Sequence, residues 1–338
     1  MIYMKVLAVS KLYAHKNGSG GETYLHQFLQ DIQAGGHDVS VLLPEKEEIE
    51  MTHYHGIKVF ETNEEHWRDY LRKPDLVITQ LDFSEEVINY CMKIKQRVVQ
   101  IEHCHIARDN KHLLNPKVVN IFNAPNIKKL CNQECGGVEG KTFTILPPCP
   151  DYSKYSTENI KYRQFITMVN PSKQKGGDII YKLAELMPER KFMVVEGGYY
   201  PWAQDIRFNL PNVVIQPNTQ EMIKDVYMKS RIVLQPSRWE TYGMVSAEAR
   251  SCGIPTIVSK ASGLLDNHGV VALYGNTLGE DEEATNENVL KYKQLIEMLD
   301  HQPSYLLWSQ HALDTAERVR KIQKEQVQEF LDWLEELS

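Results

Sequence analysis

Two carboxylates eight positions apart stand out in the segment PSRWETYGMVSAEARSCGIPTIVS, which begins at residue 236. Glu240 lies in the turn after an apolar, strand-like run, and Glu248 lies within a stretch of helical composition. If the separation were helical throughout, the two carboxylates would lie about 12 Å apart along the axis. The two carboxylates of a glycoside hydrolase lie closer, roughly 5 to 9.5 Å apart. The spacing therefore favours a pair that holds two ends of one long ligand.

The start of the predicted helix lies between these two glutamates. A helix leaves its first backbone amides without intrahelical partners, and its dipole favours an anion at that end. The amides of Tyr242, Gly243 and Met244 are therefore candidates for binding a phosphate. A nucleotide sugar fits, because it carries phosphate in the middle and hydroxyl groups at both ends. The spacing alone leaves open the alternative that neither residue binds a ligand, with Glu240 an exposed loop residue and Glu248 a solvated helix residue.

The same segment resembles the E-x7-E signature of retaining glycosyltransferases of the GT-B fold, and in particular the GT4-like group. The resemblance extends over nearly the whole chain and is strongest in the half that contains this segment. It implies that Glu240 contacts hydroxyl groups of the transferred sugar and that Glu248 contacts the ribose of the nucleotide. It also implies that the backbone of Thr241, Tyr242 and Gly243 meets the sugar and the diphosphate.

The resemblance also indicates which cations would bind the diphosphate, and it shows one departure from the family pattern. VNPSKQKGGDIIYKLAELMP looks like the family segment that opens the second domain, and Lys175 matches its diphosphate-binding lysine. A lysine offsets the charge that builds on the leaving diphosphate as the glycosidic bond breaks. Many members carry an arginine where this chain has Asn170 and Pro171. Lys173 and Arg238 are the candidates to replace the missing cation, and Asn170 is a further donor-binding candidate.

Glycines and a histidine carry the resemblance in the first half of the chain. NGSGGETYLHQFLQ is similar to the family's Gly-Gly loop, where Gly20 and Gly21 would let backbone approach the donor phosphates or the acceptor. RVVQIEHCHIAR ends a predicted strand where the family often has an active-site histidine that faces the donor sugar. Either His103 or His105 matches, and His103 is preferred because it follows the strand directly. The alternatives are that the glycines form only a flexible loop and that the histidine has only a structural role.

Two further segments match the family loosely. VVEGGYY looks like the Gly-rich turn that lines the nucleotide pocket, which makes Gly197 a candidate. SKASGLLDNHG stands where the family has Gly-Gly-x-x-Glu, and Gly263 and Asp266 are its nearest matches. No Asp-x-Asp metal motif stands where one is needed. We therefore expect a site without a metal or another cofactor, in which the nucleotide-diphosphate sugar is the donor substrate.

Cysteine and histidine spacing gives a weak alternative, a zinc site. His103, Cys104 and His105 are adjacent, and Cys131 and Cys135 are four positions apart. Structural zinc sites usually have two pairs of closely spaced ligands, and this spacing matches no standard site. The six cysteines are scattered through the sequence. We therefore expect reduced thiols.

Composition limits the class of protein. The chain has 338 residues and a formal net charge of −7, with 25% charged and 42% hydrophobic residues, as in ordinary globular proteins. It lacks the basic surplus that would indicate a nucleic-acid partner. No apolar run reaches the roughly 18 residues of a membrane-spanning helix. We therefore expect a cytoplasmic protein; Lys128 and Lys129 beside Phe122 and Ile127 allow only weak peripheral contact with a membrane.

Short β-branched runs alternate with amphipathic helical stretches along the chain, which predicts α/β architecture with parallel sheets. The strand-like runs are 5–10, 38–44, 57–61, 75–80, 97–102, 118–122, 143–148, 165–170, 191–198, 212–216, 231–237 and 254–259. A proline-rich, polar stretch over 147–162 interrupts the alternation. The predicted fold is therefore two Rossmann-like doubly wound domains facing a central cleft, with ligands at the carboxyl ends of the strands.

The domain boundaries follow from this pattern. We predict an N-terminal Rossmann-like acceptor-binding domain over residues 1–155 and a C-terminal Rossmann-like nucleotide-sugar-binding domain over residues 156–310. Two helical stretches, 306–319 and 324–337, close the chain, so residues 311–338 form C-terminal helices. Phe330, Leu334 and Leu337 line one side of the last stretch, which we expect to pack on the N-terminal domain.

The sequence thus predicts a retaining, metal-independent glycosyltransferase. It would move a sugar from a nucleotide-diphosphate sugar to a glycan, a lipid-linked sugar or a small molecule. The alternatives are a catalytically silent nucleotide-sugar-binding protein, which the missing arginine allows, and a nucleotide-sugar epimerase on the same fold. A nicotinamide dehydrogenase fits poorly because the GSGGET loop lacks the order G-x-G-x-x-G. The donor base, the sugar, the acceptor and the oligomeric state are not indicated.

Overall fold

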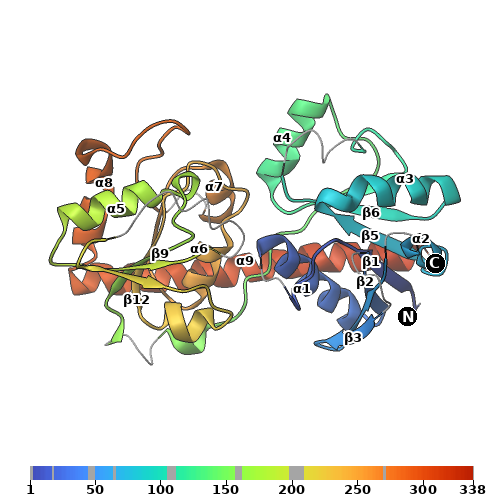
Figure 1. The fold of residues 1–338 in the computed structure, drawn as a ribbon, viewed down its shortest axis with the longest axis horizontal. Coiled ribbons are helices and arrows are strands. Elements are labelled where there is room, and N and C mark those ends of the chain that lie inside the picture. The colour runs from blue at the N-terminus through green and yellow to red at the C-terminus, as the bar shows by residue number, and fades with distance from the viewer. Residues whose placement is uncertain are drawn as a thin grey trace. The chain divides into compact units, whose positions relative to one another are not determined.

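The computed structural model describes residues 3–16, 19–44, 50–63, 66–104, 112–156, 162–197, 209–268 and 272–337. The chain divides into two compact α/β units (Figure 1). The first consists of Met1–Pro148 and Ile322–Ser338, and the second consists of Cys149–Lys321. The border after residue 148 differs from the predicted border after residue 155.

Among the described residues, the sheet of the first unit has eight strands in the order β3-β4-β2-β1-β5-β6-β7-β8. They are β1 (Lys5–Val9), β2 (Asp38–Leu43), β3 (Glu50–Tyr54), β4 (Ile57–Glu61), β5 (Leu76–Gln80), β6 (Val98–Glu102), β7 (Val118–Phe122) and β8 (Thr142–Thr144). All neighbours are parallel except β3 and β4, which are antiparallel. β3, the sequence EMTHY, was not predicted because it is mostly exposed and lacks an alternating apolar pattern.

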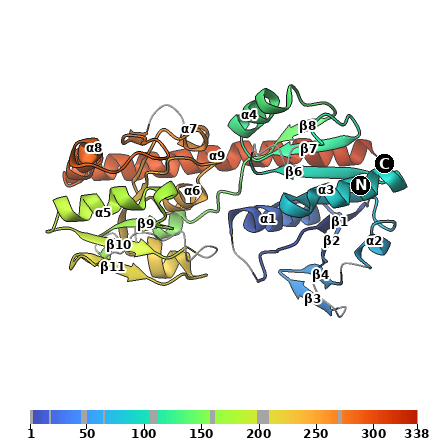
Figure 2. The ribbon, with the colours of Figure 1, turned by 45° about the horizontal axis from the view of Figure 1, so that its top comes forward.

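Helices cover both faces of this sheet, as successive residues of β1 show. Val6 and Ala8 pack into one hydrophobic cluster with α1 (Gly20–Ala34), whereas Leu7 and Val9 pack into another with α3 (Ser84–Ile94). Side chains of neighbouring strand residues point to opposite faces, so each strand contributes to two cores. Figure 2 shows these helices with α2 (Trp67–Tyr70) and α4 (Pro125–Cys135) around the sheet.

The second unit contains a six-stranded sheet, in the described residues, with the order β11-β10-β9-β12-β13-β14. All its neighbouring strands are parallel. They are β9 (Phe165–Val169), β10 (Lys191–Val195), β11 (Val213–Gln216), β12 (Ser230–Gln235), β13 (Thr256–Val258) and β14 (Leu273–Tyr274). The sequence did not predict the two-residue β14. The predicted α/β class with two Rossmann-like units is confirmed.

Helices also cover both faces of the second sheet. α5 (Gly177–Leu186) and α8 (Asn286–Met298) lie side by side over one face, where Phe192 and Val194 of β10 point (Figures 1 and 2). Met193 and Val195 point to the other face, which packs against α6 (Met244–Ser251). α7 (Ser262–His268) follows β13. Successive apolar residues of β10 therefore contribute to the cores on both faces of the sheet.

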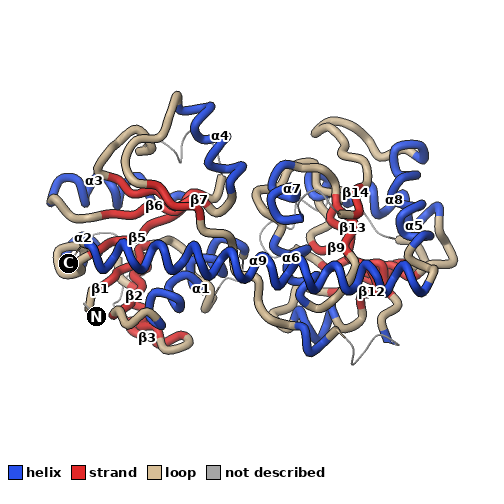
Figure 3. The backbone as a smooth tube through the Cα atoms, turned by 180° about the vertical axis from the view of Figure 1, so that it is seen from behind, coloured by secondary structure: helices blue, strands red, loops and turns tan. Residues whose placement is uncertain are grey.

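The C-terminal part of the chain is one helix, α9 (Gln302–Glu336), and not the two predicted stretches (Figure 3). The segment between them, RKIQ, has no glycine or proline to end a helix. The first part of α9 belongs to the second unit, and the last part belongs to the first. Phe330 and Leu334 are fully buried in the core of the first unit, and Leu337 packs against that core.

None of the helices in the described residues has the length and apolar character to cross a membrane. The patch predicted to touch a membrane, Lys128 and Lys129 with Phe122 and Ile127, does not expose its apolar side chains. Phe122 and Ile127 are fully buried, and the Nζ of Lys128 donates to the Thr142 hydroxyl at 2.9 Å. The apolar side chains beside Lys128 and Lys129 therefore belong to the interior of the first unit.

Candidate functional site

The strand order reverses between β9 and β12 of the second sheet, since the chain continues from β9 toward β11 on one side and from β12 toward β14 on the other. Open α/β sheets bind ligands at such a switch point, outside the carboxyl ends of the strands. Asn170 follows β9 directly, and Glu240 lies in the loop after β12. Two predicted site residues therefore come from the two strands that flank the switch point.

The Glu240 side chain is nearly buried and is held by four hydrogen bonds. Its Oε2 accepts from Lys175 Nζ at 2.8 Å, from Gln235 Nε2 at 2.9 Å and from the Ser237 hydroxyl at 3.3 Å. Its Oε1 accepts from the backbone amide of Thr241 at 3.2 Å. Lys175 is the cation of this cluster, and 25% of its side chain is exposed. The two predicted catalytic residues of this unit thus form a direct ion pair.

A close approach of two backbone segments brings Lys175 to Glu240. Lys173–Lys175 form a short 3-10 helix after β9, and the backbone amide of Arg238 donates to the Gln174 carbonyl at 2.9 Å. Gly176 follows with φ of 88°, and a Cβ there would lie 2.6 Å from the carbonyl oxygen of Pro236. A side chain at this position would therefore push the two segments apart.

Two more glycines shape the turn from Glu240 into α6. Gly243 has φ of 93°, a left-handed conformation that disfavours any Cβ. The amide of Gly263, in the first turn of α7, donates to the Glu240 carbonyl at 3.1 Å. A Cβ on Gly263 would lie 2.2 Å from the carbonyl carbon and oxygen of Thr241. α7 therefore packs directly on the peptide group that follows the candidate sugar-binding carboxylate.

The predicted phosphate-binding amides lie at the N-terminus of α6, which Met244 begins. Gly243 is its N-cap, and no side chain caps the helix. Ser246, one turn later, donates its amide to Gln235 Oε1 at 3.1 Å, so Gln235 bonds to both Glu240 and α6. The Tyr242 side chain is buried, and burial raises the pKa of its hydroxyl. Tyr242 can therefore meet a ligand only through its backbone.

Asn267 is a site residue that the sequence did not indicate. It is fully buried on α7, and its Nδ2 donates to the carbonyls of Tyr242 at 3.0 Å and of Gly243 at 2.8 Å. These bonds orient the two peptide groups at the start of α6. Asp266, the looser of the two matches in this segment, precedes Asn267 and is half-buried.

Glu248 lies on α6 and contacts a different part of the unit. The Tyr227 hydroxyl donates to Glu248 Oε2 at 2.6 Å. Burial raises the pKa of the Glu248 carboxyl, and the bond from Tyr227 partly opposes that shift. Burial also raises the pKa of the Tyr227 hydroxyl, so it remains a donor near neutral pH. Glu248 is thus a half-buried carboxylate oriented by a neutral tyrosine.

The structure does not support the predicted role of Arg238 as a phosphate-binding cation. Its side chain is 1% exposed, and it donates to both carboxylate oxygens of Asp178, at 2.8 and 2.7 Å. Its other hydrogen bonds go to the carbonyl oxygens of Lys173, Gly279 and Glu282. Arg238 instead joins α5 to the segment before α8. Lys173, the other candidate, forms an ion pair with Glu283.

Asn170 and Gly197 meet at the ends of β9 and β10. Asn170 has φ of 58°, and its amide donates to the Val195 carbonyl at 2.9 Å. A Cβ on Gly197 would lie 2.9 Å from Asn170 Cγ. Glycine is therefore required at position 197 for contact with Asn170. The rest of the Gly-rich turn, residues 198–200, lies outside the described residues.

His103 belongs to a polar cluster at the carboxyl end of the first sheet. Its Nε2 donates to Gln80 Oε1 at 2.8 Å, and its Nδ1 accepts from the Asn123 amide at 3.4 Å. Burial lowers the pKa of His103 to about 4, so the ring is neutral at physiological pH. Gln80 and Asn123 were not predicted as site residues, because glutamine and asparagine at strand ends are common. His105 lies outside the described residues.

The strand order of the first sheet reverses between β1 and β5, and the Gly-Gly segment lies at that point. Gly20 begins α1 and is exposed, and Gly21 follows in its first turn. A Cβ on Gly21 would lie 3.2 Å from Leu81 Cδ1 and 3.9 Å from His103 Nε2. The structure therefore brings Gly21 and His103 together in the first unit.

A pocket of about 150 Å³ lies at the carboxyl ends of β1, β2 and β4 in the same unit. Its lining includes Lys11, Tyr13, His15, Lys16, Leu43 and Glu61. Glu61 is 2% exposed, and its Oε1 accepts from His15 Nε2 at 3.2 Å and from Lys16. Glu61 was not among the residues predicted from the sequence. The pocket combines two lysines and a histidine with one buried carboxylate.

A metal site is not visible in the described part of the chain, where no three His, Cys, Asp or Glu side chains gather to hold an ion. Cys131 and Cys104, from the weak zinc alternative, meet through a bond from the Cys131 thiol to the Cys104 carbonyl. Burial raises the pKa of Cys131 above its usual range. The raised pKa keeps this thiol protonated, as its bond to the Cys104 carbonyl requires.

Two Rossmann-like units in one chain agree with the GT-B class of fold. A family described as "Family 4 Glycosyltransferase in conflict systems" matches residues 202–326, less than half of the chain. The chain is thus GT4-like and has the GT-B fold, as the resemblance predicted.

Individual relatives are distant. O-antigen chain mannosyltransferase B of Escherichia coli is 20% identical over 271 residues, which cover 76% of this chain and 65% of the relative. A D-inositol 3-phosphate glycosyltransferase of Mycobacteroides abscessus is 30% identical over 110 residues, 30% of this chain and 24% of the relative. The matches span less than two thirds of these curated relatives. The structure of Anabaena HepE with UDP and glucose aligns with a TM-score of 0.72 at 18% identity, covering 97% and 99% of the two chains.

Proposed function

We propose that the protein is a retaining, metal-independent glycosyltransferase that moves a sugar from a nucleotide-diphosphate sugar to a glycan, lipid-linked or small-molecule acceptor. The ion pair between Lys175 and Glu240 carries this proposal. It brings a cation and the carboxylate proposed to bind the sugar together at the switch point of the second sheet, in the loop that leads into α6. A helix N-terminus and a lysine are a suitable pair of groups for a diphosphate without a metal.

The donor would lie along the loop from Glu240 to Glu248. Glu240 would accept hydroxyl groups of the sugar, Lys175 and the first amides of α6 would hold the diphosphate, and Glu248 would accept the ribose hydroxyls. Tyr227 supports this role because its bond fixes one oxygen of Glu248. The relatives support the donor class, since HepE was solved with UDP and glucose.

Chemistry in such a site needs little from acid–base side chains. The bond between the sugar and the diphosphate breaks, the acceptor oxygen bonds to the same face of the sugar, and the acceptor proton passes to the leaving phosphate. The protein would contribute position and charge stabilisation. His103 is consistent with this scheme, because its lowered pKa suits a neutral hydrogen-bonding group better than a proton donor.

Thermal unfolding with UDP, GDP, ADP and dTDP tests the donor proposal. A nucleotide at about 100 times its dissociation constant adds about 2.7 kcal/mol of stability, so one base should raise the unfolding midpoint clearly. Glu248→Ala should remove that increase. Glu287→Ala, at an exposed position on α8, should keep it.

The outcomes separate the proposed enzyme from its alternatives. No stabilisation by any of the four nucleotides would contradict a nucleotide-sugar site of this design. Stabilisation that Glu248→Ala retains would mean that Glu248 does not hold the ribose. Binding without release of nucleotide from the matching nucleotide sugar, over a panel of acceptors, would instead identify a silent binder.

We further propose that the acceptor binds in the pocket around Glu61 and carries an anionic group. Lys11, Lys16 and His15 surround one buried carboxylate, so cationic groups outnumber anionic ones in the described lining. Glu61 would accept acceptor hydroxyl groups, and the lysines would hold a phosphate ester. A relative whose name specifies D-inositol 3-phosphate supports an acceptor of this class.

Glucose and glucose 6-phosphate probe this pocket, because they differ only in the phosphate. We expect glucose 6-phosphate to bind more tightly and Lys11→Met to weaken its binding about tenfold, the value of one charge-assisted hydrogen bond. Lys58→Met, at an exposed position on β4, should have no effect. Isothermal calorimetry measures the affinities. Equal binding of the two sugars, or equal loss in both variants, would exclude the pocket as an anion-binding acceptor site.

A further inference from the structure

The guanidinium of Arg250 is buried without a carboxylate partner among the described residues. Arg250 lies on α6 and is 2% exposed. Its Nη2 donates to Asn267 Oδ1, whereas Nε and Nη1 have no hydrogen-bond partner in the described structure. A buried donor without a partner is costly, and a buried cation without a counter-charge costs more. Within the described residues, this guanidinium therefore lacks both a counter-charge and acceptors for two of its donor nitrogens.

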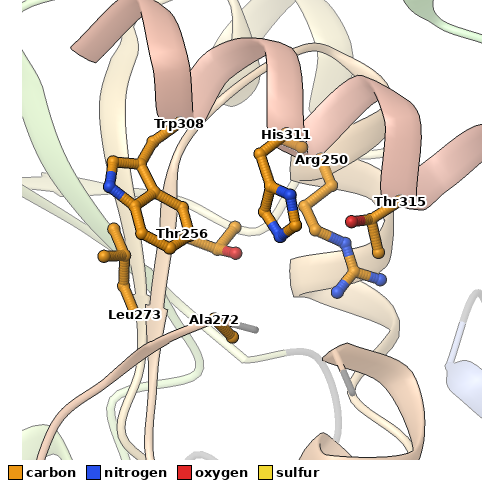
Figure 4. Close-up of a pocket in the computed structure, with 8 residues that line it drawn as sticks. Arg250, Thr256, Ala272, Leu273, Trp308, His311 and Thr315 are labelled. Atoms are coloured by element: carbon orange, nitrogen blue, oxygen red, sulfur yellow. The ribbon is translucent and has the colours of Figure 1, made fainter. Parts of the chain in front are cut away.

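A small pocket lies next to this guanidinium. Figure 4 shows His311 and Thr315 of α9 beside Arg250, with Trp308 on the far side of His311. The described lining consists of Arg250, Thr256, Ala272, Leu273, Trp308 and the α9 residues His311, Ala312 and Thr315. Trp308 and His311 are only half-buried, so the pocket is accessible from solvent. Its volume is about 10 Å³, which holds roughly one water-sized particle.

We infer that this pocket binds a monatomic anion of the halide class, such as chloride, on the guanidinium of Arg250. The volume matches a halide ion or a single water molecule and is small for a phosphate or a nucleotide. A water molecule would accept hydrogen bonds but would leave the buried charge uncompensated. A halide accepts the same bonds and supplies the missing counter-charge.

The electrostatic surroundings favour the anion over water. Burial lowers the pKa of Arg250, and the nearby Arg318 lowers it further. The groups that raise this pKa are Tyr242, Cys149 and Tyr274, which are neutral near pH 7. No carboxylate is among these groups, so a bound anion would supply the counter-charge that the described residues lack.

The proposed anion would also act on the candidate donor loop. Arg250 bonds to Asn267 Oδ1, and Asn267 Nδ2 holds the carbonyls of Tyr242 and Gly243. An anion that fixes Arg250 therefore fixes Asn267 and the peptide groups at the start of α6. The anion site lies outside the set of residues proposed to touch the donor, and its existence does not depend on the proposed activity.

Thermal unfolding in sodium chloride and in sodium gluconate of equal ionic strength tests the inference. Gluconate is too large for the pocket, so chloride should raise the unfolding midpoint by about 2 to 4 °C relative to gluconate. Arg250→Met should abolish this difference, and Thr315→Val should reduce it. Lys321→Gln removes an exposed cation of the same helix and should preserve the difference.

Two results would overturn the inference. One is an equal midpoint in chloride and gluconate for the unaltered protein. The other is a chloride response that Arg250→Met retains, which would place the anion elsewhere and leave a water molecule in the pocket. If Arg250→Met fails to fold, the line width of ³⁵Cl in nuclear magnetic resonance decides the matter. It should broaden with the unaltered protein and less with Thr315→Val; no broadening would exclude the site.

Discussion

Lys175→Met should reduce turnover of the nucleotide sugar by roughly 10²- to 10³-fold, as expected when one group that stabilises developing charge is removed. Lys175 is the cation bonded to Glu240, at 2.8 Å, and its partly exposed side chain is accessible to a ligand. The Glu240 carboxylate keeps its bonds from Gln235, Ser237 and Thr241 in the variant, so the loop should remain folded. Release of nucleotide from the donor measures the loss.

Lys173→Met is the matched control for this variant. Lys173 lies in the same short helix but pairs with Glu283, outside the cluster around Glu240. We expect turnover within about twofold of the unaltered protein, because exposed ion pairs contribute little. If Lys175→Met kept full turnover at an unchanged unfolding midpoint, the lysine would be structural and the proposed diphosphate site would be wrong.

Gly263→Ala should destabilise the second unit by about 1 to 3 kcal/mol and remove most nucleotide binding. The added Cβ would lie 2.2 Å from the Thr241 carbonyl group and 2.5 Å from the Glu240 carbonyl oxygen. These atoms are backbone, so relief requires α7 or the donor loop to move. Displacement of the loop would shift Glu240 and the start of α6 together. Thermal unfolding and nucleotide affinity, measured on one preparation, report both effects.

Gly279→Ala is the matched control for Gly263→Ala, because it adds the same methyl group at another glycine of the second unit. A Cβ at residue 279 would lie 3.9 Å from its nearest neighbours, both on Glu282, which is ordinary contact. We expect stability and nucleotide affinity close to those of the unaltered protein. A Gly263→Ala protein with equally unchanged properties would show that contact between α7 and the loop does not hold the site in place.

The sequence predicted the strands and failed where tertiary contacts override local pattern. Apolar, β-branched runs such as those at β1 and β12 can be recognised as strands from the sequence, because strands buried on both faces are continuously hydrophobic. β3 is held at the sheet edge by backbone bonds to β4, which its side chains do not reveal. The break predicted near residue 320 did not exist, because polar residues alone do not end a helix.

The candidate site was predictable where backbone geometry demands a residue type. Gly243 has a left-handed φ and Gly263 touches backbone, so both positions need glycine. Arg238 shows the limit of such reasoning, since nothing local distinguishes a ligand-binding arginine from one that pairs with Asp178. Asn267 was missed for the same reason. The two carbonyls that it holds, those of Tyr242 and Gly243, lie more than twenty residues away along the chain.

The C-terminal part of α9 has a consequence for the order in which the chain folds during synthesis. Val327, Phe330, Trp333 and Leu334 contribute to the core of the first unit, whose sheet is encoded before residue 148. A ribosome adds residues from the N-terminus, at roughly 5 to 20 per second. The sheet of the first unit therefore emerges with part of its core uncovered. It can complete that core only after the whole second unit has been translated.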